Sequence, residues 1–226
     1  MTNPWLDTPA DAPFVVASDR DAVSKFNATA NCASHIHTEL LPEPYLGRPD
    51  APVLLLNLNP GYDPGDLEQH TDSYFGGKCR SNLSHEASDY PFYLLDPKVE
   101  GPGRHWWRRR LKAPLADCGD HAVSQNVFCV EFFPYHSREF HHHRLRLDSQ
   151  AYGFSLVRAA VTRGALMVVM RSKKLWFEAV PELENYPTLF ELRNVRTPAV
   201  SPKNCPDGYE AIITAINAAK RPAVKT

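Results

Sequence analysis

Several features that define particular protein classes are missing from this 226-residue chain. It contains no run of about 18 apolar residues, so we expect no membrane-spanning segment. The five cysteines are scattered and form no CxxC pair, which argues against a zinc site or an iron–sulfur cluster and favours reduced thiols. The first residues lack a signal-peptide pattern, and neither GxxxxGKS/T nor GxGxxG occurs. These absences predict a cytoplasmic protein without a metal or another cofactor.

Charge is distributed unevenly along the chain, although its net value is only −1. Residues 1–75 include 11 acidic and 3 basic residues, whereas residues 76–226 include 15 acidic and 22 basic residues. The basic residues concentrate in 104–112, beside Trp106 and Trp107, and in 136–146. This pattern suits contacts to phosphates and stacking on bases, but a solvated helix face with a buried tryptophan would produce it as well. The small net charge fits a small-molecule ligand better than tight binding of duplex DNA.

Periodicity predicts an α/β fold. Continuous apolar or alternating segments predict strands at residues 53–58, 126–133, 165–171 and 188–194. Helical patterns occupy residues 19–30, 148–163, 173–180 and 207–220. Strands that alternate with helices imply a parallel sheet covered on both faces. We therefore expect one domain over residues 1–226: a three-layer α/β/α sandwich around a four-stranded parallel sheet, with a loop insertion at 65–103 and flexible termini.

Polar side chains follow three of the predicted strands where each strand ends. The first strand leads into Asn57 and Asn59, just before a Pro-Gly turn. The second leads into Glu131, and the third into Arg171. Ligands of open α/β sheets bind outside the carboxyl ends of the strands, so these residues are expected to converge on a site. An ordinary turn after each strand is the alternative interpretation.

The segment Asn57-Leu58-Asn59-Pro60-Gly61 resembles the GINPG motif of the uracil-DNA glycosylase superfamily. The strand–helix–strand order over 165–194 is similar to the unit that leads into HPSPLS or NPSGLS in that family, where this chain has Arg196-Thr197-Pro198-Ala199-Val200-Ser201. The resemblance covers roughly residues 50–205. It implies that Asn59 positions the attacking water, that Glu131 stands where an asparagine reads the base edge, and that Thr197 replaces a histidine or asparagine that stabilises the departing base.

Strand-end positions and the resemblance together define three groups of candidate residues. The catalytic candidates are Asn59, Glu131 and Thr197. The candidates for binding the base or ligand are Asn57, Tyr62, Asp63, Phe75, Tyr135 and His136. The candidates for binding phosphate are Arg171, Ser201, Lys203 and Asn204. No metal site is predicted, because adjacent side chains such as His141, His142 and His143 point in different directions.

The resemblance implies a DNA glycosylase-like protein that hydrolyses an N-glycosidic bond of a modified base without a metal. Its partner would be DNA or a nucleobase-containing small molecule. Two alternatives remain open: a non-catalytic nucleic-acid- or nucleotide-binding module, and a hydrolase of free nucleosides or nucleotides. Thr197 has no cationic form, which favours the binding module, whereas Asn59-Pro60-Gly61 favours the enzyme. A Glu131 carboxylate would also repel a uracil carbonyl, which argues against uracil as the substrate. Since Thr197 and the backbone N–H groups after it are the only donors that the last motif offers to a departing base, any excision is expected to be slow.

Overall fold

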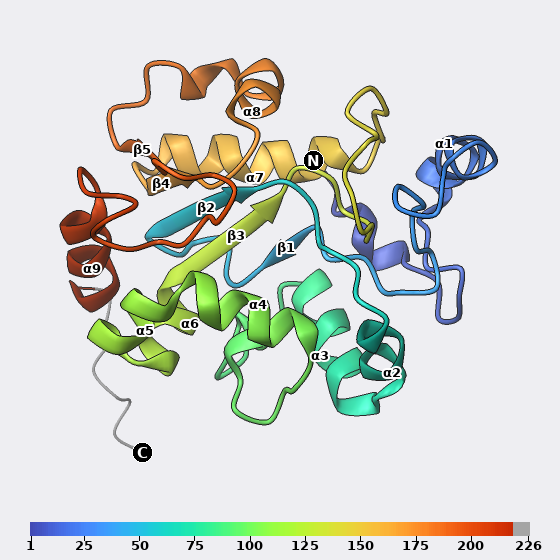
Figure 1. Ribbon diagram of the computed structural model, residues 1–226, viewed down its shortest axis with the longest axis horizontal. Helices are drawn as coiled ribbons and strands as arrows, with labels where there is room; N and C mark the ends of the chain where they lie inside the picture. Colours follow the sequence, from blue (N-terminus) through green and yellow to red (C-terminus); the bar gives the residue numbers. More distant parts are fainter. Residues whose placement is uncertain (219–226) are drawn as a thin grey trace.

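The computed structural model describes residues 1–218, which form an α/β fold around a five-stranded sheet (Figure 1). The strand order is β1-β3-β2-β4-β5. The strands are β1 (Tyr45–Leu46), β2 (Val53–Asn57), β3 (Val127–Glu131), β4 (Leu166–Val169) and β5 (Leu189–Glu191). Strands β2 to β5 are parallel and match the four predicted strands, so the α/β class is confirmed.

The sheet is mixed rather than purely parallel, because β1 joins β3 at the edge in antiparallel orientation. The predicted four-stranded parallel sheet therefore corresponds to β2–β5 and lacks the antiparallel edge strand β1. Strand β1 has only two residues, which is too short for a recognisable periodicity. Tyr45 and Leu46 are nevertheless fully buried, and pairing with β3 satisfies backbone groups that would otherwise be buried without partners.

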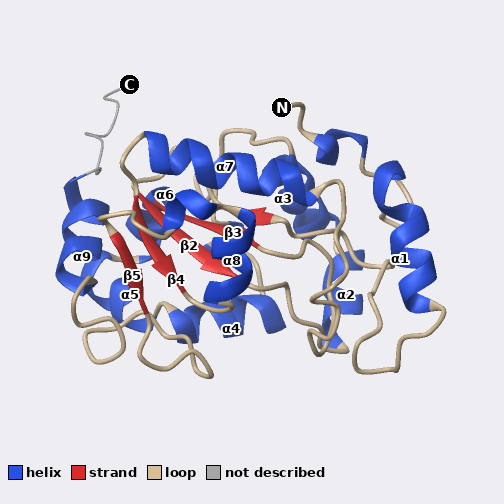
Figure 2. Cartoon of the chain, turned by 90° about the horizontal axis from the view of Figure 1, so that it is seen from above, coloured by secondary structure: helices blue, strands red, loops and turns tan. Residues whose placement is uncertain are grey.

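Helices cover both faces of the sheet, as the continuous apolar strands predict. Alternate residues of β2 enter two separate cores: Val53 and Leu55 pack on one face, and Leu54 and Leu56 on the other. Figures 1 and 2 show α7 and α8 over one face and α4, α5, α6 and α9 over the opposite one. The helices are α1 (Arg20–Asn27), α2 (Gly65–Thr71), α3 (Ser73–Leu83), α4 (Pro102–Arg110), α5 (Lys112–Cys118), α6 (Asp120–Asn126), α7 (Gln150–Thr162), α8 (Lys173–Ala179) and α9 (Tyr209–Ala218).

The span 65–103 differs from the expected loop insertion, because it contains α2, α3 and the 3-10 turn Tyr93–Leu95. Asp72 caps α3 by accepting a hydrogen bond from the backbone N–H of Phe75 at 2.8 Å. Phe75, Cys79 and Leu83 then recur every four residues and are all buried. This spacing is a helical signal that the glycines in the same segment obscured.

The chain ends also differ in part from the prediction of flexible termini. The N-terminal residues form the 3-10 turn Pro4–Asp7, and Trp5 in this turn is buried in the core beside α7 and α8. The predicted flexibility of the C-terminal end concerns residues 219–226, which lie outside the described residues. Among the described helices, none is long and apolar enough to cross a membrane.

Replacing Trp176 by Phe is expected to lower the free energy of unfolding by about 1–3 kcal/mol. Trp176 is fully buried in α8, and its Nε1 donates to the backbone carbonyl of Asn57 at 2.8 Å. The substitution removes this hydrogen bond and leaves a small cavity. Urea denaturation measures the loss, with the half-buried neighbour changed as Phe177→Leu for comparison. Equal midpoints for wild type and Trp176→Phe would contradict this prediction.

Candidate functional site

A cavity of about 630 Å³ opens at the carboxyl ends of the central parallel strands. Its floor is formed by the ends of β2 and β3 and by Arg171, two residues after β4. Residues of α2, α3 and α4 form one wall. The structured span 65–103 therefore helps to build this site. Eight of the predicted site residues line the cavity: Asn57, Asn59, Tyr62, Asp63, Phe75, Glu131, His136 and Arg171.

Asn57 and Glu131 form a buried pair on the cavity floor. They are register partners on β2 and β3, and Asn57 Nδ2 donates to Glu131 Oε1 at 2.9 Å. The exposed fraction is 3% for Asn57 and 5% for Glu131. A carboxylate here is almost removed from water, so its ionised form lacks most of the solvation that would stabilise it.

Burial raises the pKa of Glu131 to about 8, although the hydrogen bond from Asn57 and the nearby charge of Arg171 act in the opposite direction. Around neutral pH, Glu131 is therefore mostly protonated and has an O–H group that can donate. This differs from the expectation that Glu131 would repel a carbonyl, because that expectation assumed a carboxylate. The sequence identifies the residue, but only its depth in the fold sets its protonation.

Three side chains of the cavity floor have buried polar atoms without hydrogen-bond partners among the described residues. These atoms are Asn57 Oδ1, Glu131 Oε2 and Arg171 Nε. A buried polar atom without a partner costs about 1–3 kcal/mol, so native structures contain few of them. Three such atoms on neighbouring strand ends indicate a binding site in which a polar ligand would supply the missing hydrogen-bond partners.

Asn59 follows β2, and its side-chain amide is held in one orientation. Its Nδ2 donates to the Pro60 carbonyl at 2.8 Å and to Ser137 Oγ at 3.0 Å. Both amide hydrogens are then in use, which leaves Oδ1 as the acceptor that Asn59 offers. An amide oxygen can orient a water molecule but is too weak a base to remove its proton.

Glu43, His70 and His136 gather beside the cavity, with one potential metal-binding atom from each within 4.8 Å of the others. His136 faces two backbone carbonyl oxygens, of Gly61 at 2.8 Å and Leu41 at 3.1 Å. Because a carbonyl only accepts, the ring satisfies both contacts when both of its nitrogens carry hydrogen. These contacts of His136 tie the turn after β2 to the segment before β1.

His70 is neutral, since burial lowers its pKa to about 2. Its Nδ1 accepts a hydrogen bond from the Leu41 N–H at 3.0 Å, which places the ring hydrogen on Nε2. This hydrogen bond engages the Nδ1 lone pair of His70. Burial also raises the pKa of Glu43. The hydrogen bonds of this trio suit a positioning network better than a metal site.

The predicted last motif does not reach the cavity. Thr197 is exposed, and Thr197, Ser201, Lys203 and Asn204 are not among the residues that line it. Asn204 instead closes its own loop: Nδ2 donates to the carbonyls of Asn194 and Ala199, at 3.2 and 2.9 Å. Asn59 and Glu131 therefore share one cavity, and Thr197 lies outside it.

Two predicted aromatic ligands of the base are already engaged within the protein. Tyr135 lies in the core between the sheet and helices α7 and α8, where its hydroxyl donates to Asp19 at 2.9 Å. Tyr62 lines the cavity, but His37 stacks on one of its faces with ring centroids 3.4 Å apart. One face of Tyr62 is therefore already covered by His37.

Sequence reasoning missed Asp66 and His70, which line the cavity from α2. Their spacing of four residues places both on one helix face, and this was the available signal. A prediction that treats 65–103 as a loop does not use this helical spacing. Trp106 of α4 also lines the cavity, whereas sequence reasoning placed it only beside a basic patch.

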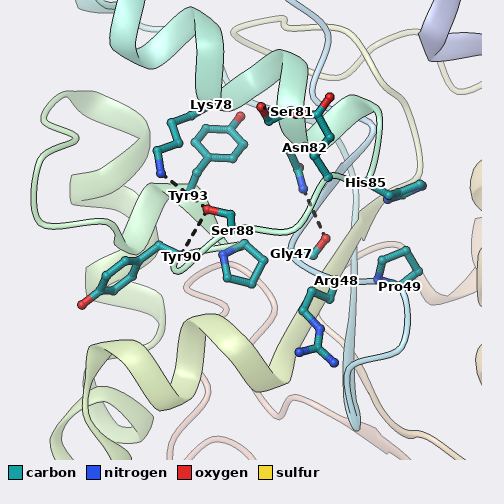
Figure 3. A pocket seen from close by; sticks show the side chains of 12 residues that line it. Gly47, Arg48, Pro49, Lys78, Ser81, Asn82, His85, Ser88, Tyr90 and Tyr93 are labelled. Carbon is teal, nitrogen blue, oxygen red and sulfur yellow. Dashed lines mark hydrogen bonds between the residues drawn. The ribbon is translucent and has the colours of Figure 1, made fainter. Parts of the chain in front are cut away.

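A second hollow, between α3 and the residues after β1, is too small for an organic ligand (Figure 3). Its volume of about 20 Å³ is close to that of one water molecule. Asn82 Nδ2 donates across it to the Gly47 carbonyl at 3.2 Å, and Ser88 Oγ accepts from the Tyr90 N–H at 3.2 Å. His85, which also lines this hollow, keeps a buried Nδ1 without a hydrogen-bond partner among the described residues.

Comparisons of the chain with protein-family models, with curated proteins and with solved structures give no match. The resemblance of residues 57–61 to the uracil-DNA glycosylase superfamily therefore stays a prediction.

Glu131→Gln is expected to make the protein more stable at neutral and alkaline pH. The Glu131 pKa is about 8 in the folded chain, against an ordinary value of 4.5. Between these values the unfolded chain releases the proton and the folded chain keeps it. The free energy of unfolding therefore falls by up to about 1.4 kcal/mol per pH unit as pH rises, and then levels off above pH 8.

Urea denaturation at several pH values between about 5 and 8 measures this slope. Glu131→Gln removes the titrating group, so its slope is smaller, whereas the exposed control Glu184→Gln keeps the wild-type slope. Parallel curves for wild type and Glu131→Gln would show that Glu131 titrates normally.

Proposed function

We propose that this protein binds a nucleobase in the cavity and hydrolyses the N-glycosidic bond between that base and its sugar. The observation that supports this most strongly is the set of unpartnered polar atoms on the cavity floor, next to the oriented amide of Asn59. Base edges present a donor beside an acceptor. The side-chain oxygen Oδ1 of Asn57 and a protonated Glu131 offer the complementary acceptor and donor.

The reaction would use the two strand ends for different tasks. Asn59 Oδ1 would accept a hydrogen bond from a water molecule and so direct the water oxygen at the sugar carbon. As the bond between that carbon and the base nitrogen breaks, Glu131 would donate its proton to the departing base. Water then supplies the hydroxyl group of the sugar and returns a proton to Glu131. Arg171, which lies near Glu131, would stabilise the negative charge that develops on the base before Glu131 transfers its proton.

A small nucleobase-containing molecule is the substrate class that these residues favour over duplex DNA. Arg104 and Arg108 of the basic helix α4 lie beside the carboxylates of Glu100 and Asp120. Arginines engaged in this way contribute less to a surface that attracts phosphate backbones. DNA remains the alternative partner, as a single strand whose base enters the cavity.

A binding module without catalysis is the second candidate function. The observation that favours it is the placement of Thr197 outside the cavity, so the last motif supplies no donor to a departing base. Arg171 and Glu131 are then the cavity-lining donors proposed for that role.

The decisive assay offers the wild-type protein a panel of nucleosides, nucleotides and oligonucleotides that contain ordinary, deaminated or damaged bases. Chromatography under single-turnover conditions detects the free base, and strand cleavage detects abasic sites. We expect slow release of at least one easily departing base. Ligand binding without release of any base would favour the binding module, and neither binding nor release would contradict both candidates.

A further inference from the structure

Two arginines approach one tryptophan at the wall of the cavity. The guanidinium carbon of Arg110, the last residue of α4, lies 5.0 Å from the Trp106 ring centroid. That of Arg171, which follows β4, lies 5.9 Å from the same centroid. Trp106 and Arg171 line the cavity, so this cluster adjoins the Asn57–Glu131 pair.

These two arginines differ from Arg104 and Arg108 of α4. Arg104 and Arg108 have carboxylate partners, whereas Arg110 and Arg171 form no ion pair with any of the described residues. The Nε atoms of Arg110 and Arg171 are both buried without a hydrogen bond. The one carboxyl noted near Arg171 is that of Glu131, which is mostly neutral around pH 7.

Contacts within the protein do not account for this arrangement. A cation–π contact contributes about 0.5–1 kcal/mol, and a cation at a helix C-terminus a similar amount. Against this, burial and the charges of Arg171 and Arg109 lower the pKa of Arg110, so the cluster is electrostatically unfavourable. Guanidinium groups bind phosphate oxygens through charge-assisted hydrogen bonds, so an anion between Arg110 and Arg171 would relieve their repulsion.

We infer that Arg110 and Arg171 bind a phosphate group of the ligand whose base occupies the adjoining cavity. The substrate is then a nucleotide, free or within a strand, rather than a nucleoside. This inference rests on the proposed function for the identity of the base. The chemistry follows from the guanidinium group, whose paired N–H donors match phosphate oxygens. The end of α4 is fixed in place, because the Arg110 carbonyl accepts from the Val200 N–H at 2.9 Å.

The test compares nucleosides with their 5′-monophosphates by titration calorimetry, using wild type, Arg110→Gln and the exposed control Arg196→Gln. We expect the monophosphate to bind wild type and the control about 10-fold more tightly than the nucleoside. In Arg110→Gln this advantage should shrink to about twofold or less, with nucleoside affinity unchanged. Arg110→Lys, which keeps the charge but loses the paired donors, should lie between the two.

Two further arms separate the outcomes. A single-stranded pentanucleotide that binds more tightly than the monophosphate would identify a strand as the source of the phosphate, and the reverse would identify a free nucleotide. Inorganic phosphate should raise the melting temperature of wild type but not of Arg110→Gln. If it does so while no nucleoside binds, the phosphate site stands and the proposed function fails. Equal affinities for nucleoside and nucleotide in wild type, or an unchanged advantage in Arg110→Gln, would overturn the inference.

Discussion

Asn59→Ala is expected to lower the rate of base release by about 100-fold or more, while ligand affinity changes by less than about twofold. The amide of Asn59 is fixed by Pro60 and Ser137, so its oxygen can hold water in one place without gripping the ligand. Loss of that oxygen therefore removes an interaction needed for the reaction and not for binding. Single-turnover kinetics, with affinity measured by titration calorimetry, separates the two quantities.

The matched control is Asn185→Ala, which removes an exposed asparagine outside the cavity and should leave the rate unchanged. Base release that survives Asn59→Ala would show that the role carried over from the family motif is wrong. Glu131 and Asp63, which line the same cavity, would then be the next candidates for water activation.

Glu131→Gln is expected to slow base release by about 100-fold to 10,000-fold, the usual loss when a general acid is removed. The glutamine amide can still contact Asn57 and the base, so affinity should change little. In wild type the rate should fall as pH rises through about 8, because the Glu131 proton is lost there. The residual activity of Glu131→Gln should lack this fall.

Glu131→Gln is therefore expected to slow base release and, at neutral and alkaline pH, to increase the stability of the protein. If Glu131 had only a structural role, Glu131→Gln would not combine slower base release, higher stability and a flattened pH dependence of the rate. A wild-type rate that stays constant between about pH 7 and 9 would argue against Glu131 as the proton donor.

The sequence predicted the central strands because their signal is local. Residues 53–57 are continuously apolar up to Asn57, and both faces of this strand are buried. The same pattern placed Asn57, Asn59 and Glu131 at strand ends, and all three line one cavity. Strand β1 escaped prediction because two residues show no period, and they are held by pairing with a distant strand.

Other features of the site depend on distances that a sequence does not display. The protonation of Glu131 follows from its depth, and the orientation of Asn59 follows from Ser137, a residue 78 positions away. Tyr135 is directed into the opposite core, toward Asp19. The loop that contains Thr197 closes on itself through Asn204, so similarity in motif order did not bring it to the cavity.

The most direct test of a nucleobase at the Asn57–Glu131 pair is the number of protons exchanged when free bases bind. Titration calorimetry with uracil, hypoxanthine, guanine, cytosine and adenine, repeated in buffers of different ionisation enthalpy, measures this number. At pH 8 about half of the Glu131 groups are ionised, so a base that accepts their hydrogen bond should draw in roughly half a proton. Uptake should be near zero at pH 6 and absent in Glu131→Gln. No binding of any base, or binding at pH 8 without proton uptake, would contradict a base edge paired with protonated Glu131.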